Sequence, residues 1–198
     1  MGEHGPMVYL AVMGLRWGEI AGLRVKSLNF DGETVAIIIQ RTRGSKGSMV
    51  EQVPKTRNSR RILSLPAWLM VMLKNSLQQR NVLGDGDALV FVSPLGEPLH
   101  YSNWRRRIWL KASSEVGLLN LTFHDLKHTA ATTLVEEGVD IKTAQQRLGH
   151  ANPQTTLRVY AQVTSKADKA AAKIVGDRLG PTSMEIREAL KDPGLNTE

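Results

Sequence analysis

Three side chains that can exchange protons or bind anions stand close together at His124, Lys127 and His128. Spacings of three and four residues place all three on one face of a helix. Two imidazoles and an ammonium make a poor core, so this face is either solvated or part of a site. If it is a site, the imidazoles can move protons and the ammonium can hold an anion.

Other segments with polar residues accompany this one in a definite order. The chain contains, from N- to C-terminus, MGLRWGEIAGLR, VPKTRNSRRILSLP, TFHDLKHTAATTL and LGHANPQTTLRVY. Across about residues 8–175 this ordered set resembles the tyrosine recombinase (phage-integrase-type) family. The family pattern has Arg in a GLRxGE-type turn, Lys in a sheet turn, an HxxR box, His or Trp in an LGH-type turn, and then Tyr. The residues that match this pattern are Arg16, Lys55, His124, Lys127, His150 and Tyr160.

One matched position departs from the family pattern. The third residue after His124 is Lys127, where the family usually has Arg. Lysine keeps the positive charge but lacks the planar fork that binds two phosphate oxygens at once. We therefore expect a point charge at this position, in a site that is either active or attenuated.

The matched residue types suit phosphodiester exchange. Negative charge spreads over the non-bridging oxygens of the reacting phosphate, where Arg16, Lys127 and His150 would hold them. The resemblance implies that Tyr160 attacks and forms a covalent 3′-phosphotyrosine, with His124 as its general base. Lys55 is the expected acid for the departing 5′ oxygen. Because the linkage conserves bond energy, neither ATP nor a metal or other cofactor is expected.

Each of these residues also has an ordinary structural interpretation. Arg16 could pair with Glu19, and Lys55 could belong to a solvated basic sheet edge together with Arg57, Arg60 and Arg61. His150 could complement a helix dipole, and Tyr160 could be a core residue beside Leu157. For His128 we favour a structural role, because the family pattern does not require it. Asp125 could cap a helix or steady a neighbouring base.

Basic residues outside the matched set are candidates for DNA contact. They belong to the expected loop 41–48, to the turn that follows it, and to the start of an expected helix. These candidates are Arg41, Arg43, Lys46, Arg57, Arg105, Arg106 and Arg107. The alternative for the three consecutive arginines is a surface helix whose aliphatic stems cover Trp104 and Trp109.

The elements that must position these residues form an early sheet followed by helices. Short helices are expected around residues 7–15 and 17–23. Alternating apolar runs then predict a small antiparallel sheet of about three strands, comprising residues 34–40, 49–53 and 60–65. Residues 41–48 have no apolar side chain and are expected to form a flexible turn or loop.

The period changes to helical spacing after Pro66, where Leu69, Leu73 and Leu77 form part of an apolar stripe. Further helices are expected over residues 102–116, 122–137, 140–148, 153–160 and 166–178. Ser102, Thr122 and Asp140 are the expected N-caps. The fold class is therefore α+β, a mostly helical catalytic domain with a small three-stranded antiparallel sheet near the N-terminus.

Composition narrows the classes of function. The chain has 198 residues, with 26 Lys and Arg against 19 Asp and Glu, and its net charge of +7 favours a polyanionic partner. Cysteine is absent, which excludes disulfides and thiolate chemistry. No apolar run reaches the length that a membrane span needs, and no signal peptide is visible. A cytoplasmic protein that acts on DNA is expected.

The resemblance also implies a domain organisation and partners. Residues 1–178 would form the catalytic domain and residues 179–198 a polar C-terminal tail. The N-terminal DNA-clamp domain of the family is expected to be absent from this chain. The implied partners are a double-stranded DNA recombination site and accessory DNA-bending proteins. A homotetramer is expected on DNA, and a monomer or weak association without it.

Three other functions remain open at this level. A metallohydrolase could use His124 and His128, which have the spacing of helical zinc ligands, with His150 as a third. A DNA-binding module could keep the fold without turnover. A type IB topoisomerase shares the chemistry but would relax supercoiled DNA without a site requirement.

Overall fold

The computed structural model of the chain describes residues 4–43, 49–52, 60–150, 152 and 154–161, with single positions at 168, 172, 174, 175 and 178. Lys46, Lys55 and Arg57 lie outside the described residues, as do the proposed tail 179–198 and most of the expected helix 166–178. The α+β class is confirmed, because helices predominate and the strands form small antiparallel sheets. No helix in the described part of the chain is long and apolar enough to cross a lipid bilayer.

The N-terminal helices build the centre of the fold. Helix α1 spans Gly5–Val12 and α2 spans Trp17–Ala21. Between them, Gly14 takes a φ of +101°, a conformation that glycine adopts without steric cost. Met7 and Leu10 of α1 are completely buried in the main apolar core. This turn therefore places Arg16 at the start of α2, next to the buried residues of α1.

The strands form two sheets rather than the single expected one. In the first, β2 (Thr34–Ile37) lies between β1 (Leu28–Asn29) and β5 (Arg61–Ser64), with Val35 opposite Leu63. In the second, β3 (Gln40–Arg43) pairs with β4 (Met49–Gln52). The expectation of a loop over residues 41–48 was wrong at its start, because Arg41, Thr42 and Arg43 pair with β4. Backbone hydrogen bonding across the hairpin overrides the lack of apolar side chains there.

Strand β3 packs closely on α2 because two glycines leave room for it. A Cβ added to Gly18 would lie 2.6 Å from the Arg41 carbonyl oxygen. At Gly22, one turn later, the added Cβ would lie 3.2 Å from the Arg41 nitrogen. The backbone of Arg41 is therefore held against α2, which fixes the origin of its side chain.

The middle of the chain adds a helix to the main apolar core and supplies an aromatic cluster. Helix α3 (Ala67–Gln79) buries Leu69, Leu73 and Leu77, as the apolar stripe predicts. The run 101–115 comprises α4 (Tyr101–Trp104), a π-helical turn η4 (Arg105–Trp109) and α5 (Leu110–Glu115). Its N-cap is His100 rather than the expected Ser102. Trp104 and Trp109 stack at 5.9 Å and both contact Phe123.

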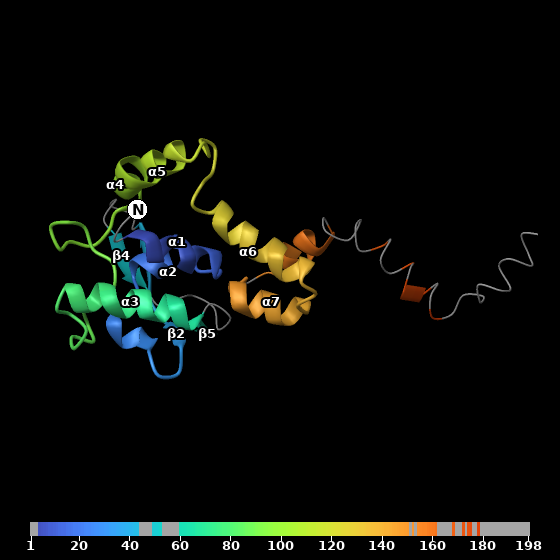
Figure 1. The fold of residues 1–198 in the computed structure, drawn as a ribbon, viewed down its shortest axis with the longest axis horizontal. Coiled ribbons are helices and arrows are strands. Elements are labelled where there is room, and N and C mark those ends of the chain that lie inside the picture. Colours follow the sequence, from blue (N-terminus) through green and yellow to red (C-terminus); the bar gives the residue numbers. More distant parts are fainter. Residues whose placement is uncertain are drawn as a thin grey trace, which may run out of the picture.

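The C-terminal helices gather at one end of the molecule (Figure 1). They are α6 (Asp125–Glu136), α7 (Ile141–Leu148) and the helical residues 154–161. Their small apolar cluster centres on Ala130, Ala131 and Leu148. The expected N-cap Asp140 is confirmed, since its carboxylate accepts from the Thr143 nitrogen at 3.0 Å. The expected start of α6 at Thr122 was three residues early, because a turn precedes the helix.

A buried ion pair joins β5 to α2. The Arg61 side chain is only 7% exposed and the Glu19 side chain 1%. Two nearly parallel hydrogen bonds connect them, Nη1 to Oε1 at 2.9 Å and Nη2 to Oε2 at 3.0 Å. The interpretation of Arg61 as part of a solvated sheet edge is therefore wrong. Its neighbour Arg60, in contrast, is exposed.

Replacing Arg61 with Met should lower the free energy of unfolding by about 3 kcal/mol, because Glu19 would stay buried with one cation fewer. Urea unfolding followed by circular dichroism measures this loss. Arg60→Met is the matched control, since the exposed side chain should contribute less than about 0.5 kcal/mol. Equal losses in the two variants would show that the pair does not stabilise the fold.

The contribution of the pair should also depend on pH. Burial raises the pKa of Glu19, but the hydrogen bonds and charge of Arg61 outweigh it and lower the pKa below the ordinary 4.5. A carboxyl whose pKa is lowered by folding stabilises the fold above its ordinary pKa, and this contribution disappears as the pH falls. The gap between the wild type and Arg61→Met should therefore be full at pH 7 and shrink below pH 4.5. A gap that stays constant far into the acid range would contradict this assignment.

Candidate active site

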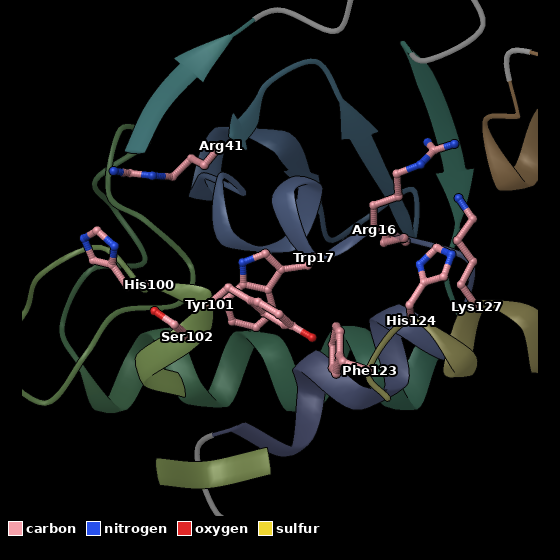
Figure 2. Close-up of a pocket in the computed structure, with 10 residues that line it drawn as sticks. Arg16, Trp17, Arg41, His100, Tyr101, Ser102, Phe123, His124 and Lys127 are labelled. Atoms are coloured by element: carbon pink, nitrogen blue, oxygen red, sulfur yellow. The ribbon is translucent and has the colours of Figure 1, made fainter. Parts of the chain in front are cut away.

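Three of the sequence-predicted residues share one cavity. Arg16, His124 and Lys127 line a pocket of about 440 Å³ and lie together at one side of it (Figure 2). Arg16 comes from the start of α2, His124 from the N-cap position of α6 and Lys127 from its first turn. Segments far apart in the chain thus converge on a basic corner.

Arg16 is held on two sides and remains partly open. Its backbone nitrogen donates to Glu19 Oε2 at 2.7 Å, and its Nη1 donates to Glu19 Oε1 at 3.1 Å. Its Nη2 donates to the Gly149 carbonyl at 2.7 Å. The predicted pairing with Glu19 is therefore present, yet 35% of the side chain is exposed. An anion in the cavity could still reach this guanidinium.

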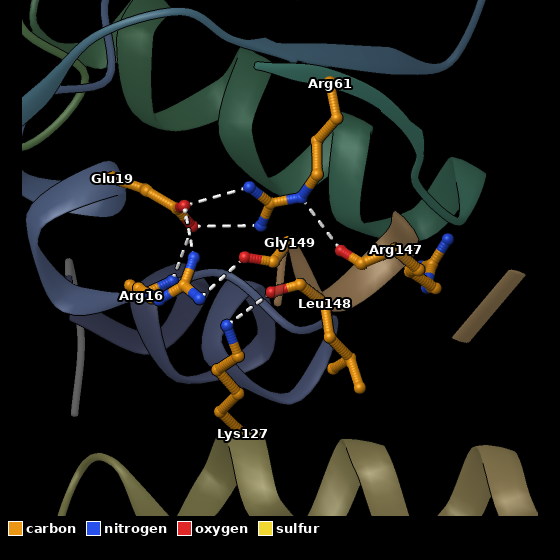
Figure 3. Close-up of polar contacts among 7 residues, drawn as sticks. All are labelled: Arg16, Glu19, Arg61, Lys127, Arg147, Leu148 and Gly149. Carbon is orange, nitrogen blue, oxygen red and sulfur yellow. Dashed lines mark hydrogen bonds and ion pairs between the residues drawn. The ribbon is translucent and has the colours of Figure 1, made fainter. Parts of the chain in front are cut away.

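Three cations converge on three successive carbonyls at the C-terminal end of α7 (Figure 3). Arg61 Nε donates to the Arg147 carbonyl at 2.9 Å, and Lys127 Nζ donates to the Leu148 carbonyl at 2.5 Å. The Arg16 bond to Gly149 completes the series. Carbonyls at a helix end lack intrahelical donors and carry the negative end of the helix dipole. The end of α7 is therefore fixed by the same cations that surround the site.

Gly149 makes this arrangement possible. It ends α7 in the left-handed conformation, with a φ of 62°. A Cβ at this position would lie 2.6 Å from Arg61 Nη1 and 3.2 Å from Arg16 Nη1. Glycine is therefore required both by the backbone conformation and by the two guanidinium groups that flank it.

Burial, together with neighbouring cations, changes the acidity of Lys127. Its side chain is buried, and burial lowers its pKa to about 7, with a further lowering by Arg16 and Arg61 and an opposing effect of Glu19. The ammonium therefore exchanges its proton near neutrality. An ammonium has three donors, of which one is used on Leu148, so two remain for an anion.

His124 lines the cavity from the N-cap position of α6, where the start of the helix is capped. The Thr122 nitrogen donates to Asp125 Oδ2 at 2.7 Å, and the Asp125 nitrogen donates back to Thr122 Oγ1 at 3.3 Å. Asp125 therefore has the capping role that was one of its two candidates. Partial desolvation, with the charges of His128 and Lys127, lowers the pKa of His124. A neutral imidazole here can accept a proton at physiological pH.

His150 directly follows Gly149, the C-cap of α7. Burial lowers its pKa to about 4, with contributions from the charges of Lys127 and Arg16, so the ring is neutral at pH 7. Its Nδ1 is 3.0 Å from Thr156 Oγ1, and Thr156 is 1% exposed. The hydroxyl of Thr156 therefore orients His150 and attaches the helical residues 154–161 to the end of α7.

Tyr160 is not brought to the cavity. Its hydroxyl donates to the carbonyl of Val139, just before the N-terminal end of α7. The basic corner lies at the other end of α7, and the eight residues of this helix span about 12 Å. Burial and the nearby Asp140 raise the pKa of Tyr160, which disfavours its ionised form. The alternative of a core tyrosine beside Leu157 is not supported, since Leu157 is 44% exposed.

The candidate DNA-contact residues divide into several groups. Arg41 lines the cavity, and Arg43 ends strand β3. Arg105, Arg106 and Arg107 are exposed and begin the π-helical turn η4, directly after α4. Lys46 and Arg57, like the predicted acid Lys55, fall outside the described residues.

Sequence reasoning predicted that Glu19 pairs with Arg16, but it missed the ion pair of Glu19 with Arg61 and the positioning role of Thr156. A signal for Arg61 was present, because it shares the period-two face of Leu63 and Leu65, which are buried. An arginine on an inward face requires an acidic partner. No comparable pattern marked Thr156, because its role depends on where helix 154–161 packs.

The metallohydrolase alternative requires a third ligand near His124 and His128. The two rings contact each other edge-to-face at 4.9 Å. Within the described part of the chain, however, no group of three or more His, Asp or Glu side chains is placed to hold a metal ion. Lys127, on the same helix, adds a cation beside the two rings.

Curated relatives are similar in sequence over most of the length of this chain. A tyrosine recombinase XerC-like protein of Caldanaerobacter subterraneus subsp. tengcongensis is 31% identical over 182 residues, which cover 83% of this chain and 46% of the relative. The integrase of Mycobacterium phage FRAT1 is 28% identical over 175 residues, covering 87% of this chain and 52% of the relative. The chain thus spans about half the length of these curated relatives.

Solved structures and a family model agree with these relatives. The Tn1549 transposon integrase, solved in complex with transposon right end DNA, superposes with a TM-score of 0.71 at 24% identity. The match covers 90% of this chain and 59% of that one, and shows a shared fold. The family model described as the phage integrase family matches residues 7–167, the stretch that contains the basic corner, His150 and Tyr160. The chain therefore belongs to the phage integrase family.

Proposed function

We propose that this chain is the catalytic part of a site-specific DNA recombinase or integrase. The observation that carries the proposal is the convergence of Arg16, His124 and Lys127 on one cavity, with His150 beside it. Three cations, Arg16, Arg61 and Lys127, surround the carboxylate of Glu19. Positive charge therefore exceeds negative charge at this corner, and a phosphodiester would neutralise the excess.

The proposed reaction is a transesterification at phosphorus. Tyr160 Oη forms a bond to the phosphorus atom as the bond from phosphorus to the 5′ oxygen breaks, which leaves a 3′-phosphotyrosine. The phenol proton passes to His124, and Lys55 supplies a proton to the departing 5′ oxygen. Arg16, Lys127 and His150 bind the non-bridging oxygens. The reverse of these steps rejoins the strand, so neither a metal nor ATP is needed.

The resting position of Tyr160 requires a movement before cleavage. Its hydroxyl must leave the Val139 carbonyl, and helix 154–161 must carry it toward the other end of α7. Thr156, bonded to His150, lies on the same helix and is a natural pivot. Binding of DNA would supply the free energy for this shift, since a ligand can favour only the state to which it binds more tightly.

The alternative is a catalytically weak or inactive DNA-binding module of the same fold. Two observations make this module the second candidate function. The Lys127 ammonium is engaged with the Leu148 carbonyl, and the Tyr160 hydroxyl is withdrawn. Such a module would bind DNA through the same basic corner and form no covalent product.

Double-stranded DNA with a recombination site is the proposed partner, and the Tn1549 integrase, which shares the fold, was solved with transposon right end DNA. Arg41, Arg43 and the exposed run 105–107 are proposed to contact phosphates, together with Lys46 and Arg57. We also propose a homotetramer on DNA, with accessory DNA-bending proteins. Type IB topoisomerase activity would instead appear as relaxation of supercoiled DNA of any sequence.

A denaturant-resistant protein–DNA adduct is expected when the chain meets a suitable site. The probe is a pool of nicked duplexes with randomised central base pairs, incubated with chelator and selected after boiling in detergent. The nick allows the cleaved end to diffuse away, so the intermediate accumulates. Wild type should retain a subset of sequences, and Tyr160→Phe should retain none, because it lacks the attacking oxygen.

Tyr9→Phe is the matched control, since Tyr9 is 43% exposed on α1 and packs on Trp68 away from the cavity. It should form as much adduct as the wild type. Adduct from Tyr160→Phe would identify another nucleophile. If DNA binds to the wild type and to Lys127→Arg but neither forms adduct, the binding-module alternative holds.

Adduct formation by the wild type should weaken as the pH rises above 7. Lys127 has a pKa of about 7 and so loses its charge across this range. Its protonated fraction falls by about tenfold per unit well above the pKa, although a bound phosphate would move the midpoint upward. Lys127→Arg should keep its charge and its yield to about pH 9. Yields are compared across a closely spaced pH series on the selected duplex.

Lys111→Arg, an exchange at an exposed position of α5, controls for the general effect of the substitution. It should keep the wild-type pH profile. Profiles that coincide for wild type and Lys127→Arg would show that Lys127 does not contribute its charge to cleavage.

Without DNA the chain is expected to be a monomer or to associate only weakly. Light scattering coupled to gel filtration measures its mass, which is 21.9 kDa for one copy. Addition of the selected duplex should raise the assembly toward four copies. A stable tetramer in the absence of DNA would overturn this expectation.

A further inference from the structure

The cavity extends beyond the proposed catalytic corner to a second basic end. Figure 2 shows Arg41 and His100 on the side opposite Arg16, His124 and Lys127. The hydroxyl-bearing Ser102 lies beside His100 at that end. Both ends belong to the same pocket of about 440 Å³. The proposed reaction uses only one of them.

Aromatic rings form the wall between the two ends. Trp17, Tyr101 and Phe123 stand there (Figure 2), and Trp17 packs against the other two at 5.1 and 5.6 Å. Phe123 is buried, whereas Tyr101 is 37% exposed. Contacts of Trp17 and Phe123 with Trp104, at 4.7 and 5.0 Å, hold the wall in place. This apolar surface is therefore firmly supported and spans the distance between the basic ends.

The charges and donors of the lining favour an anion at the second end as well. None of the ten lining residues is acidic, and five are Arg, Lys or His. Two donors of the lining, Trp17 Nε1 and Arg41 Nε, are buried with no acceptor among the described residues. Arg41 Nη1 has a long contact to Glu51 Oε1, at 3.4 Å. Buried donors of this kind normally have a partner, so the lining retains unused hydrogen-bonding capacity.

The origin of Arg41 is fixed independently of any ligand. Its backbone rests against Gly18 and Gly22, and Trp17 precedes Gly18 on α2. Arg16 is the N-cap of that helix. The guanidinium at the second end and the guanidinium at the catalytic corner are thus both positioned by α2, on either side of Trp17.

A DNA strand repeats the same order of groups, phosphate, nucleoside and phosphate. We propose that the cavity binds one whole nucleotide of the cleaved strand together with both of its phosphates. The phosphate under attack lies at Arg16, His124 and Lys127, and the neighbouring phosphate lies at Arg41, His100 and Ser102. The nucleoside between them packs on the aromatic wall. This inference rests on the proposed function and assigns it a second phosphate subsite.

Thymidine 3′,5′-bisphosphate tests the proposal directly, because it is this unit of a strand and binds without any cleavage. The chain is titrated with the bisphosphate, with thymidine 5′-monophosphate and with inorganic phosphate, by calorimetry at low salt. The bisphosphate should bind about tenfold more tightly than the monophosphate, since a second charge-assisted contact is made. Inorganic phosphate should bind most weakly. Equal affinities for the two nucleotides, or no binding of the bisphosphate, would overturn the proposal.

Variants assign the second subsite. Arg41→Gln and His100→Gln should each reduce the preference for the bisphosphate and leave the affinity for the monophosphate within about twofold. Arg60→Gln is the matched control, because Arg60 is an exposed arginine just before β5 that does not line the cavity. It should keep the full preference. Loss of the preference in the control but not in the cavity variants would also overturn the assignment.

The two proposals can fail separately. Tyr160→Phe should bind the bisphosphate as the wild type does, because binding does not involve the nucleophile. If the bisphosphate preference is present but no adduct forms, the subsite stands and the strand-cleaving function fails. If the adduct forms but the preference is absent, the function stands and the subsite fails. Unfolding midpoints of all variants confirm that each is folded.

Discussion

The carboxylate of Glu19 lies buried between two guanidinium groups, Arg16 at the start of its own helix and Arg61 on strand β5. A buried carboxylate with one cation removed is costly, so α2 and β5 are held in a single relative position. The same two arginines then donate to carbonyls at the end of α7. Through these contacts the N-terminal core, the sheet and the C-terminal helices share one polar junction. The apolar cluster of α6 and α7 is small, which gives this junction a large part in placing them.

The junction also explains why the candidate site is basic and still has hydrogen-bond donors available for a ligand. Arg61 is engaged by Glu19 and the Arg147 carbonyl, whereas Arg16 is partly exposed and Lys127 keeps donors in reserve. Burial among cations lowers the pKa of Lys127 to about 7 and that of His150 to about 4. A bound phosphate would favour the protonated forms of both groups and raise their pKa values. An arginine at position 127 would stay charged, so the lysine makes the site more sensitive to pH.

Because Tyr160 is distant from the basic corner, DNA binding and strand cleavage would be separate steps in the proposed reaction. The basic corner lies at the C-terminal end of α7, and the hydroxyl of Tyr160, the nucleophile proposed for the reaction, is held near the N-terminal end of this helix. Thr156 connects the helix of Tyr160 to His150, so a shift of this helix would move the His150 side chain. In the proposed mechanism a premature reaction would thereby be disfavoured, because the Tyr160 oxygen is distant from the basic corner and its raised pKa keeps it protonated.

The order of motifs in the sequence determined the family, the α+β class and the grouping of Arg16, His124 and Lys127, because side-chain chemistry and helical spacing are local properties. Helix positions were also predicted closely, including the cap at Asp140. The division into two sheets was not, since pairing depends on partners distant in the chain. The burial of Arg61 opposite Glu19, the three carbonyls that receive cations and the withdrawal of Tyr160 were decided only by tertiary structure. Each depends on how separate elements pack, and a change of packing moves a charge or a hydroxyl by several ångströms without any change in local sequence.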